Sequence, residues 1–96
     1  MKVRLLRSAV EDLVSARAFY DLQEIGIGDY FLDSISADIE SLTLYGGIHR
    51  IKFGFHRMLA KRFPYGIYYK VLGGEAVVFR ILDCRRHPDW IRKNFD

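Results

Sequence analysis

Cationic and histidine side chains gather in the second half of the chain, where they could act on a phosphodiester. The candidates are His56, Arg57, Lys61, Arg62, Arg86 and His87. A metal-free ribonuclease needs a general base near the 2′-hydroxyl, cations around the phosphate and an acid for the leaving oxygen. Strand alternation would put Arg57 and Lys61 on one face of a strand, and His56 and Arg62 on the other. Because exposed basic side chains on a sheet are more often solvated than catalytic, these residues alone do not establish an enzyme.

Other catalytic and metal-binding chemistries have little support. None of the three histidines, His49, His56 and His87, stands at helical ligand spacing from another ligand, and only Cys84 and His87 could form a pair. The single cysteine, Cys84, excludes a disulfide framework and ends an apolar run, where a buried, unreactive thiol is the usual outcome. The sequence has neither a Gly-x-Ser-x-Gly motif nor a glycine-rich phosphate loop. We therefore expect no metal and no cofactor.

Aromatic side chains are interleaved with basic ones between residues 62 and 70, as in proteins that stack single-stranded bases. The tyrosines in this run are Tyr65, Tyr68 and Tyr69. Tyr69 alternates with Ile67 and Val71 in the way that a core-facing strand requires. We therefore expect Tyr69 to be structural and Tyr65 or Tyr68 to be free.

The chain has 96 residues, half of them apolar and 15% aromatic, which fits one folded domain spanning residues 1–96. Its net charge of +3 conceals an asymmetry: residues 1–46 carry a net −4 and residues 47–96 a net +7. A basic half of this density favours a polyanion or an acidic protein surface as partner. No apolar run is long enough to cross a membrane or to form a signal peptide. We expect a cytoplasmic protein with no membrane partner.

Two amphipathic helices are predicted in the acidic half. Ser8 and Glu11 have the spacing of a capping box, and the apolar residues that follow predict a helix from about residue 8 to 24. Gly26 and Gly28 should turn the chain. A second helical stripe then runs from Leu32 to Leu42 and should end at the Gly46-Gly47 pair. The short connection predicts an antiparallel helical hairpin.

Strands are predicted on either side of this hairpin. The short apolar segment at residues 2–6 indicates one strand, and aromatic and β-branched residues indicate four more. These are Ile48–Phe53, Phe55–Phe63, Ile67–Leu72 and Ala76–Leu82. Gly73-Gly74 suits a two-residue hairpin, the lack of alternation in Ala76–Phe79 indicates a central strand, and Pro88 could begin a short helical turn. The predicted class is α+β: an N-terminal strand and helical hairpin packed on a mainly antiparallel, four- to five-stranded sheet.

Three segments of the chain carry motifs of one known family. They are Ala9–Leu13 followed by Phe19-Tyr20, Arg62–Tyr69, and Arg85–Trp90. Taken in order, they resemble the ParE/RelE superfamily, the toxins of type II toxin–antitoxin systems. The last segment is similar to the ParE branch, whose members are also described as plasmid stabilisation proteins. The resemblance spans nearly the whole chain and implies the same α+β fold.

The two branches of that family imply different chemistry. RelE-like members cut messenger RNA on the ribosome and need an Arg directly after the Tyr of the central strand, where this chain has Gly66. The resemblance therefore favours a ParE-like toxin, a non-enzymatic inhibitor of DNA gyrase that a cognate antitoxin neutralises, in a possible toxin–antitoxin hetero-oligomer. One alternative is a metal-independent, ribosome-dependent endoribonuclease using Arg57, Arg62, Arg86 and His87. Another is a degenerate toxin that only binds its antitoxin.

Partner contacts are expected on the basic half and the tail. The residues are Arg57, Lys61, Arg62, Tyr65, Arg85, Arg86, His87, Trp90 and Arg92.

Overall fold

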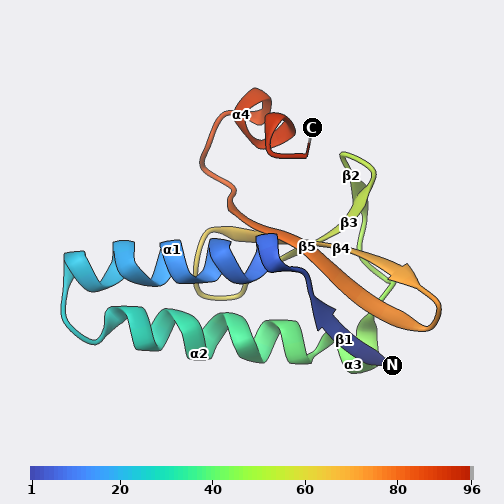
Figure 1. Ribbon diagram of the computed structural model, residues 1–96, viewed down its shortest axis with the longest axis horizontal. Coiled ribbons are helices and arrows are strands. Elements are labelled where there is room, and N and C mark those ends of the chain that lie inside the picture. The colour runs from blue at the N-terminus through green and yellow to red at the C-terminus, as the bar shows by residue number, and fades with distance from the viewer. Residues whose placement is uncertain (96) are drawn as a thin grey trace.

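The computed structural model describes residues 1–95, which form five strands and four helices (Figure 1). In chain order these are β1 (Lys2–Leu5), α1 (Arg7–Gln23), α2 (Ile27–Glu40), α3 (Leu42–Tyr45), β2 (Ile51–Lys52), β3 (Phe55–Leu59), β4 (Tyr65–Leu72), β5 (Glu75–Asp83) and α4 (Pro88–Lys93).

The strands form a single sheet in the order β1-β5-β4-β3-β2. β1 runs parallel to β5, and every other neighbouring pair is antiparallel. Gly73 and Gly74 take φ angles of +55° and +77°, as the tight hairpin between β4 and β5 requires. The sheet therefore confirms the predicted mainly antiparallel α+β class.

The structure corrects the bounds of two predicted strands. The segment predicted as Ile48–Phe53 contributes only Ile51–Lys52, because the positive φ angles of Phe53 (+56°) and Gly54 (+84°) turn the chain directly afterwards. The segment predicted as Phe55–Phe63 stops at Leu59, and a loop then carries the chain into β4. The hydrophobic residues beyond Leu59 fill the core from that loop instead of extending the strand.

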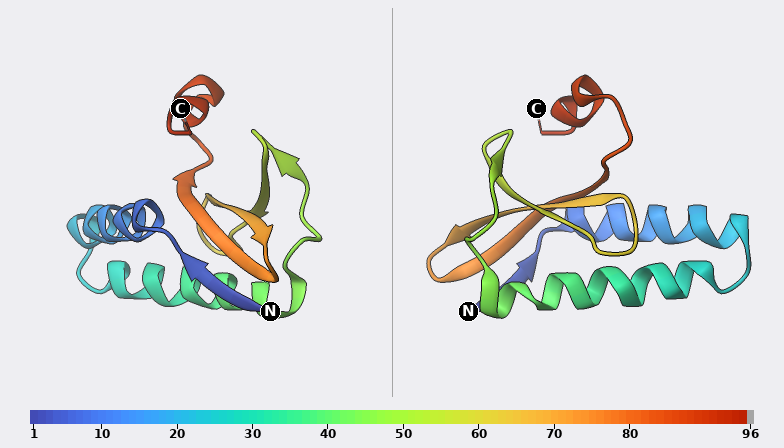
Figure 2. Two further views of the ribbon diagram at one scale, coloured as in Figure 1. Left: turned by 45° about the vertical axis from the view of Figure 1, so that its right-hand side comes forward. Right: turned by 180° about the vertical axis from the view of Figure 1, so that it is seen from behind.

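α1 and α2 pack as an antiparallel hairpin against one face of the sheet (Figure 2). The predicted apolar stripes face inward, with Ala9 and Leu13 of α1 buried against Ile35 and Ile39 of α2. Phe31 and Tyr20 stack at 5.0 Å between ring centroids and meet the sheet at Tyr65. Burial of these large side chains is the main driving force for docking the hairpin.

The helix ends differ from the expected capping pattern. Leu6, not Ser8, is the N-cap of α1, and the Ser8 hydroxyl instead donates a 2.6 Å hydrogen bond to the carbonyl of Phe79 on β5. The turn needs only Gly26 (φ +94°), because Gly28 lies inside α2. A methyl group on Gly28 would come within 2.3 Å of the Asp21 carboxylate, which accepts a hydrogen bond from the Gly28 amide.

The opposite face of the sheet carries a second, smaller core under α4. Tyr68, Leu82 and Ile91 are buried there, and Phe95 packs against them. The predicted helical turn at Pro88 is therefore a short helix that covers this face (Figure 2). β5 lies between two neighbours, and its residues Ala76–Val78 are at most 1% exposed, which confirms the predicted central strand.

Candidate functional site

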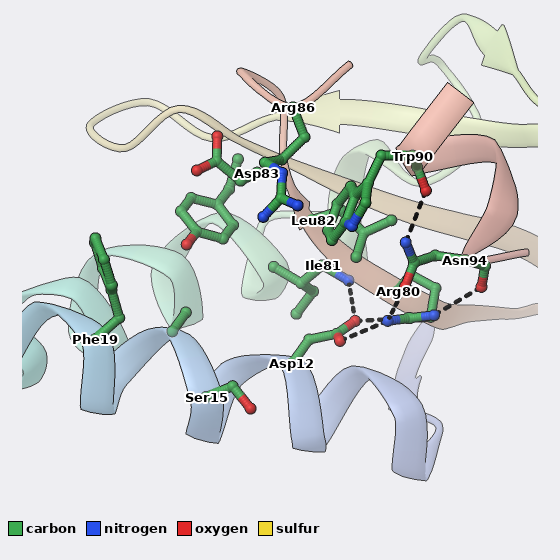
Figure 3. Close-up of a pocket in the computed structure, with 12 residues that line it drawn as sticks. Asp12, Ser15, Phe19, Arg80, Ile81, Leu82, Asp83, Arg86, Trp90 and Asn94 are labelled. Carbon is green, nitrogen blue, oxygen red and sulfur yellow. Dashed lines mark hydrogen bonds and ion pairs between the residues drawn. The ribbon is translucent and has the colours of Figure 1, made fainter. Parts of the chain in front are cut away.

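A cleft of about 330 Å³ opens between α1, the end of β5 and α4 (Figure 3). It is concave, partly apolar and bordered by charged side chains, which is the usual form of a binding site. Its lining residues are Asp12, Ser15, Ala16, Phe19, Tyr65, Arg80, Ile81, Leu82, Asp83, Arg86, Trp90 and Asn94.

The floor of the cleft is held together by α1 side chains that bond to the edge of β5. β1 pairs with β5 only as far as Val78. Beyond that point the Ser8 hydroxyl donates to the Phe79 carbonyl, and the Ile81 amide donates to Asp12 Oδ2 at 2.9 Å. Buried backbone groups need such partners, so Ser8 and Asp12 continue the edge where β1 stops.

Arg80 connects the three walls of the cleft. Its Nε and Nη2 donate to the two carboxylate oxygens of Asp12, each at 2.8 Å, and its Nη1 donates to the Asn94 carbonyl at 2.7 Å (Figure 3). The hydrogen bond to Asp12 holds the pKa of Arg80 above its usual value. The ion pair thus fixes the angle between α1, β5 and the segment that follows α4.

Arg86 and Trp90 form the outer rim. The Arg86 guanidinium lies over the Trp90 ring, 4.0 Å from its centroid, in a cation–π contact. Trp90 is held by α4, whose first turn begins at Pro88 and is capped by His87, with the His87 Nδ1 accepting from the Asp89 amide at 3.1 Å. The structure thus brings together three residues predicted to contact a partner.

Arg85 does not join the contact between Arg86 and Trp90 but bonds to Asp83. Its guanidinium and amide bond to the carboxylate of Asp83, with a shortest distance of 2.7 Å. That hydrogen bond lowers the pKa of Asp83, and it raises the pKa of Arg85. Although Arg85 is exposed, its charge is largely matched within its own chain.

Arg57 lies on the face of the sheet that α4 covers. It stands opposite Tyr68 in the β3–β4 register, and its charge acts on the half-buried thiol of Cys84. Desolvation raises the pKa of Cys84, which favours the less reactive protonated thiol, although the side chain is only partly buried and not fully buried as expected. Gly66 lies among these side chains: a methyl group there would come within 3.0 Å of the Tyr68 ring, 3.1 Å of Cys84 Sγ and 3.3 Å of Arg57 Cδ.

Lys61 and Arg62 lie in the exposed loop between β3 and β4. Since β3 ends at Leu59, the strand alternation used to place both residues does not apply, and that prediction is wrong. The Lys61 amide donates to the buried carboxylate of Asp38 at 3.1 Å, which anchors the loop to α2. Arg62 remains exposed on this loop.

The expectation that Tyr65 or Tyr68 stands free is also wrong. Tyr65 is 8% exposed and Tyr68 is fully buried, because the two faces of β4 are covered by the helical hairpin and by α4. Tyr65 still forms part of the cleft wall, so a partner could reach only the edge of its ring. Burial raises the pKa of both tyrosines.

Two of the three histidines form hydrogen bonds that support the fold. His49 Nδ1 bonds to the Tyr69 hydroxyl, and His56 Nδ1 bonds to the His49 carbonyl at 2.6 Å. Tyr69 is fully buried, as expected. Within residues 1–95, no cluster of three His, Cys, Asp or Glu side chains is arranged to hold a metal ion.

The predicted contact residues therefore fall into separate groups. Arg86, His87 and Trp90 meet at the start of α4, and Arg92 lies further along this helix, 5.8 Å above the Phe53 ring. Sequence reasoning missed the Asp12–Arg80 pair: Asp12 lies in a family-like motif, but nothing in the residue spacing links it to a strand 68 residues later.

No protein-family model matches the chain, and no curated protein sequence matches it. Among solved structures, the chain is similar to one from the chromosomal ParDE TA system of P. aeruginosa, with a TM-score of 0.76 and 21% identity. The match covers 84% of this chain and 92% of that chain. The chain has a ParE-like fold. This finding confirms the predicted arrangement of an N-terminal strand, a helical hairpin and a mainly antiparallel sheet.

The ParE-like fold positions the cleft in this chain. α1 supplies the floor, and the rim comes from Arg86, in the turn before α4, and from Trp90 on α4. Within the described residues, no helix is both long and apolar enough to cross a bilayer.

Proposed function

We propose that this chain is the toxin of a type II toxin–antitoxin module and that it inhibits DNA gyrase by binding it, in the cytoplasm, without cleaving a substrate. The ParE-like fold supports the first part, since the matched structure comes from a ParDE TA system. The second part depends on one observation, the stacked pair of Arg86 and Trp90 at the mouth of the cleft.

This pair suits a protein partner. Arg and Trp are enriched at the energetic centres of protein–protein interfaces, where a planar cation and a large ring contribute most per residue. Stacking on Trp90 holds the Arg86 guanidinium in place before binding, which lowers the entropy lost when a partner docks. A carboxylate on gyrase would pair with Arg86, while an apolar side chain entered the cleft.

The surroundings of Gly66 support a non-enzymatic toxin. In the ribonuclease branch of the family that the sequence resembles, members need an Arg at this position. Here even a methyl group would press on Tyr68, Cys84 and Arg57. Of the other basic candidates, Arg57 is half-buried and its charge acts on Tyr68 and Cys84. The ribonuclease therefore remains the second candidate.

The antitoxin is the other proposed partner. Residues 47–96 carry a net +7, so a complementary segment would be acidic. Among the described residues, neither β1 nor α1 forms a hydrogen bond with β5 beyond Ile81, so this segment would lie against the short outer edge formed by Leu82 and Asp83, beside the cleft. A segment that folds onto this edge would cover Arg86 and Trp90 and so block access to gyrase.

The test of the gyrase proposal is a supercoiling assay with purified gyrase and relaxed plasmid. The chain should inhibit supercoiling or trap cleaved DNA, and the protein encoded beside it should restore activity. Unchanged supercoiling at a large excess of the chain would contradict the proposal.

Primer extension in a translating extract tests the ribonuclease alternative. New messenger 5′ ends that appear only with ribosomes present would support it. A chain that neither inhibits gyrase nor produces such ends, yet binds the neighbouring protein, would be the degenerate toxin.

A further inference from the structure

α1 is apolar on two sides. Its inner side, with Ala9, Leu13 and Ala16, is buried against the sheet and α2. Its outer side repeats small apolar residues every four positions, and these are Val10, Val14, Ala18 and Leu22. Val10 is 45% exposed, Val14 is 64% exposed and Leu22 is 86% exposed. No described segment of the chain covers this outer stripe, although each of its residues would gain from burial.

Charged residues border the stripe in an alternating order. Arg7 and Glu11 lie near the start of the helix, and Arg17 and Asp21 lie near its end. Each pair contacts within the helix at i, i+4 spacing, at 3.9 Å and 4.0 Å, and all four side chains are well exposed. Such exposed pairs contribute little to stability, so Arg7 and Glu11 can turn toward a partner. Arg17 also pairs with Asp29 of α2, and Asp21 also accepts the Gly28 amide, which holds these two charges beside the stripe.

We propose that the outer stripe of α1 binds the same stripe of a second copy of this chain, with the two helices antiparallel across a two-fold axis at Val14. Turning a copy of α1 end for end about Val14 brings Val14 onto itself and Val10 level with Ala18 of the second copy. Helix geometry of about 100° per residue keeps these three positions on one face. Self-complementary contacts of this kind are the usual basis of two-fold dimers.

Charge complementarity selects a second copy as the occupant. In this register Arg7 faces Asp21 of the second copy, and Glu11 comes level with Arg17 of the second copy. Opposite charges therefore meet at both ends of the contact. A partner helix carrying one sign of charge would instead meet like charges at two of the four positions. The order of charges along α1 is therefore complementary to the order of charges along an antiparallel second copy of α1.

The size of the stripe sets the strength of the contact. Three small side chains with a charged border bury less than a standard stable interface, which needs about 800 Å² from each partner. The dimer is therefore weak in the isolated chain. It would strengthen wherever two copies are held close together, because tethering raises the effective concentration. The inference does not depend on the target of the proposed toxin.

Cysteine cross-linking tests the two-fold axis directly. In a Cys84→Ser background, Val14→Cys places one thiol on the axis, so mild oxidation should convert the full-length chain to a disulfide-linked dimer. Ser36→Cys, at an exposed position of α2 in the same background, is the matched control and should remain mostly monomeric. Equal cross-linking of the two variants, or cross-linking of neither, would overturn the proposal.

Sedimentation equilibrium provides an independent measurement without a new thiol. The parent chain should show concentration-dependent self-association. Val14→Glu places two carboxylates against each other on the axis and should weaken dimerisation by at least about tenfold, while Ser36→Glu should leave it unchanged. Circular dichroism of both variants should match the parent. A parent chain that remains monomeric at millimolar concentration, or a Val14→Glu variant that still dimerises normally, would contradict the model.

Discussion

Asp12 and Arg80 lie 68 residues apart in the chain and form a bidentate ion pair, with both hydrogen bonds at 2.8 Å. Their side chains are 14% and 21% exposed, and Asp12 also accepts the Ile81 amide. This pair joins the first helix to the last strand, while the bond from Arg80 to Asn94 extends the connection to the C-terminal segment. The cleft therefore depends on an ion pair that lies beneath it.

Asp12→Ala should destabilise the chain by about 2–4 kcal/mol, because Arg80 and the Ile81 amide would both lose their acceptor in a partly buried site. Glu11→Ala is the matched control, since Glu11 is 69% exposed and makes only a 3.9 Å contact with Arg7. It should change stability by no more than about 0.5 kcal/mol. Urea unfolding followed by circular dichroism measures both values. Equal costs for the two variants would show that the Asp12–Arg80 pair does not hold α1 in place.

The adjacent tyrosines Tyr68 and Tyr69 are both fully buried but should respond differently to loss of the hydroxyl. The Tyr69 hydroxyl accepts the Gly47 amide at 2.9 Å and bonds to His49, so Tyr69→Phe should cost about 1–2 kcal/mol. The Tyr68 hydroxyl makes no hydrogen bond of standard geometry among the described residues, although the charge of Arg57 acts on it, so Tyr68→Phe should be neutral or stabilising. Thermal unfolding of the two variants would reveal the difference. A larger loss for Tyr68→Phe would mean that its hydroxyl is bonded in solution.

His49 should make stability depend on pH. Burial, aided by the nearby His56, lowers the pKa of His49 below its usual value of 6.5, so the folded chain takes up this proton less readily than the unfolded chain. The stabilising effect is therefore complete above pH 6.5 and is lost as the pH falls toward the lowered pKa of the folded state. His49→Gln cannot titrate and should flatten the dependence of unfolding free energy on pH below 6.5. Ser36→Gln, which adds the same side chain at an exposed position without a titrating group, is the control and should leave this slope unchanged. If His49→Gln keeps the slope of the parent, another group is responsible.

Arg86→Ala and Trp90→Ala should relieve growth arrest when the chain is expressed without its antitoxin, because each removes one half of the stacked pair. Trp90 also packs against the small core under α4, so circular dichroism should first show that both variants are folded. Both should still form a soluble complex with the antitoxin. Arg86→Lys should recover only part of the activity, since an ammonium cannot stack as a planar guanidinium does. Lys93→Ala removes an exposed charge from the same helix and is the control. If both alanine variants remain fully toxic, the proposed contact surface is wrong.

The periodicity of the sequence predicted the helical hairpin, because burial of one helix face imposes a repeat that can be read directly. The lack of alternation predicted the central strand, because both of its faces are buried. The three segments that resemble the ParE/RelE superfamily, including the cationic tail, were visible because each is a local pattern. Strand ends were less predictable. Phe63 is as hydrophobic as a strand residue, yet it packs against Tyr20 and Phe31 from the loop that follows β3. Composition cannot separate a strand that buries an aromatic ring from a loop that does so.

The sequence by itself determined the helical hairpin, its amphipathic faces and the closeness of Arg86 and Trp90 in the chain, since these depend on residues a few positions apart. Only the tertiary structure decided what Ser8, Asp12 and Tyr65 do. Ser8 and Asp12 have the residue types and positions of helix-start residues. In the fold they lie beside the part of the β5 edge that β1 does not pair with, so both side chains form hydrogen bonds with β5 backbone groups. Tyr65 resembles an exposed stacking residue until the helical hairpin covers it. A hydrogen bond or a buried contact between distant segments depends on how the layers meet, and no local pattern of residues encodes that.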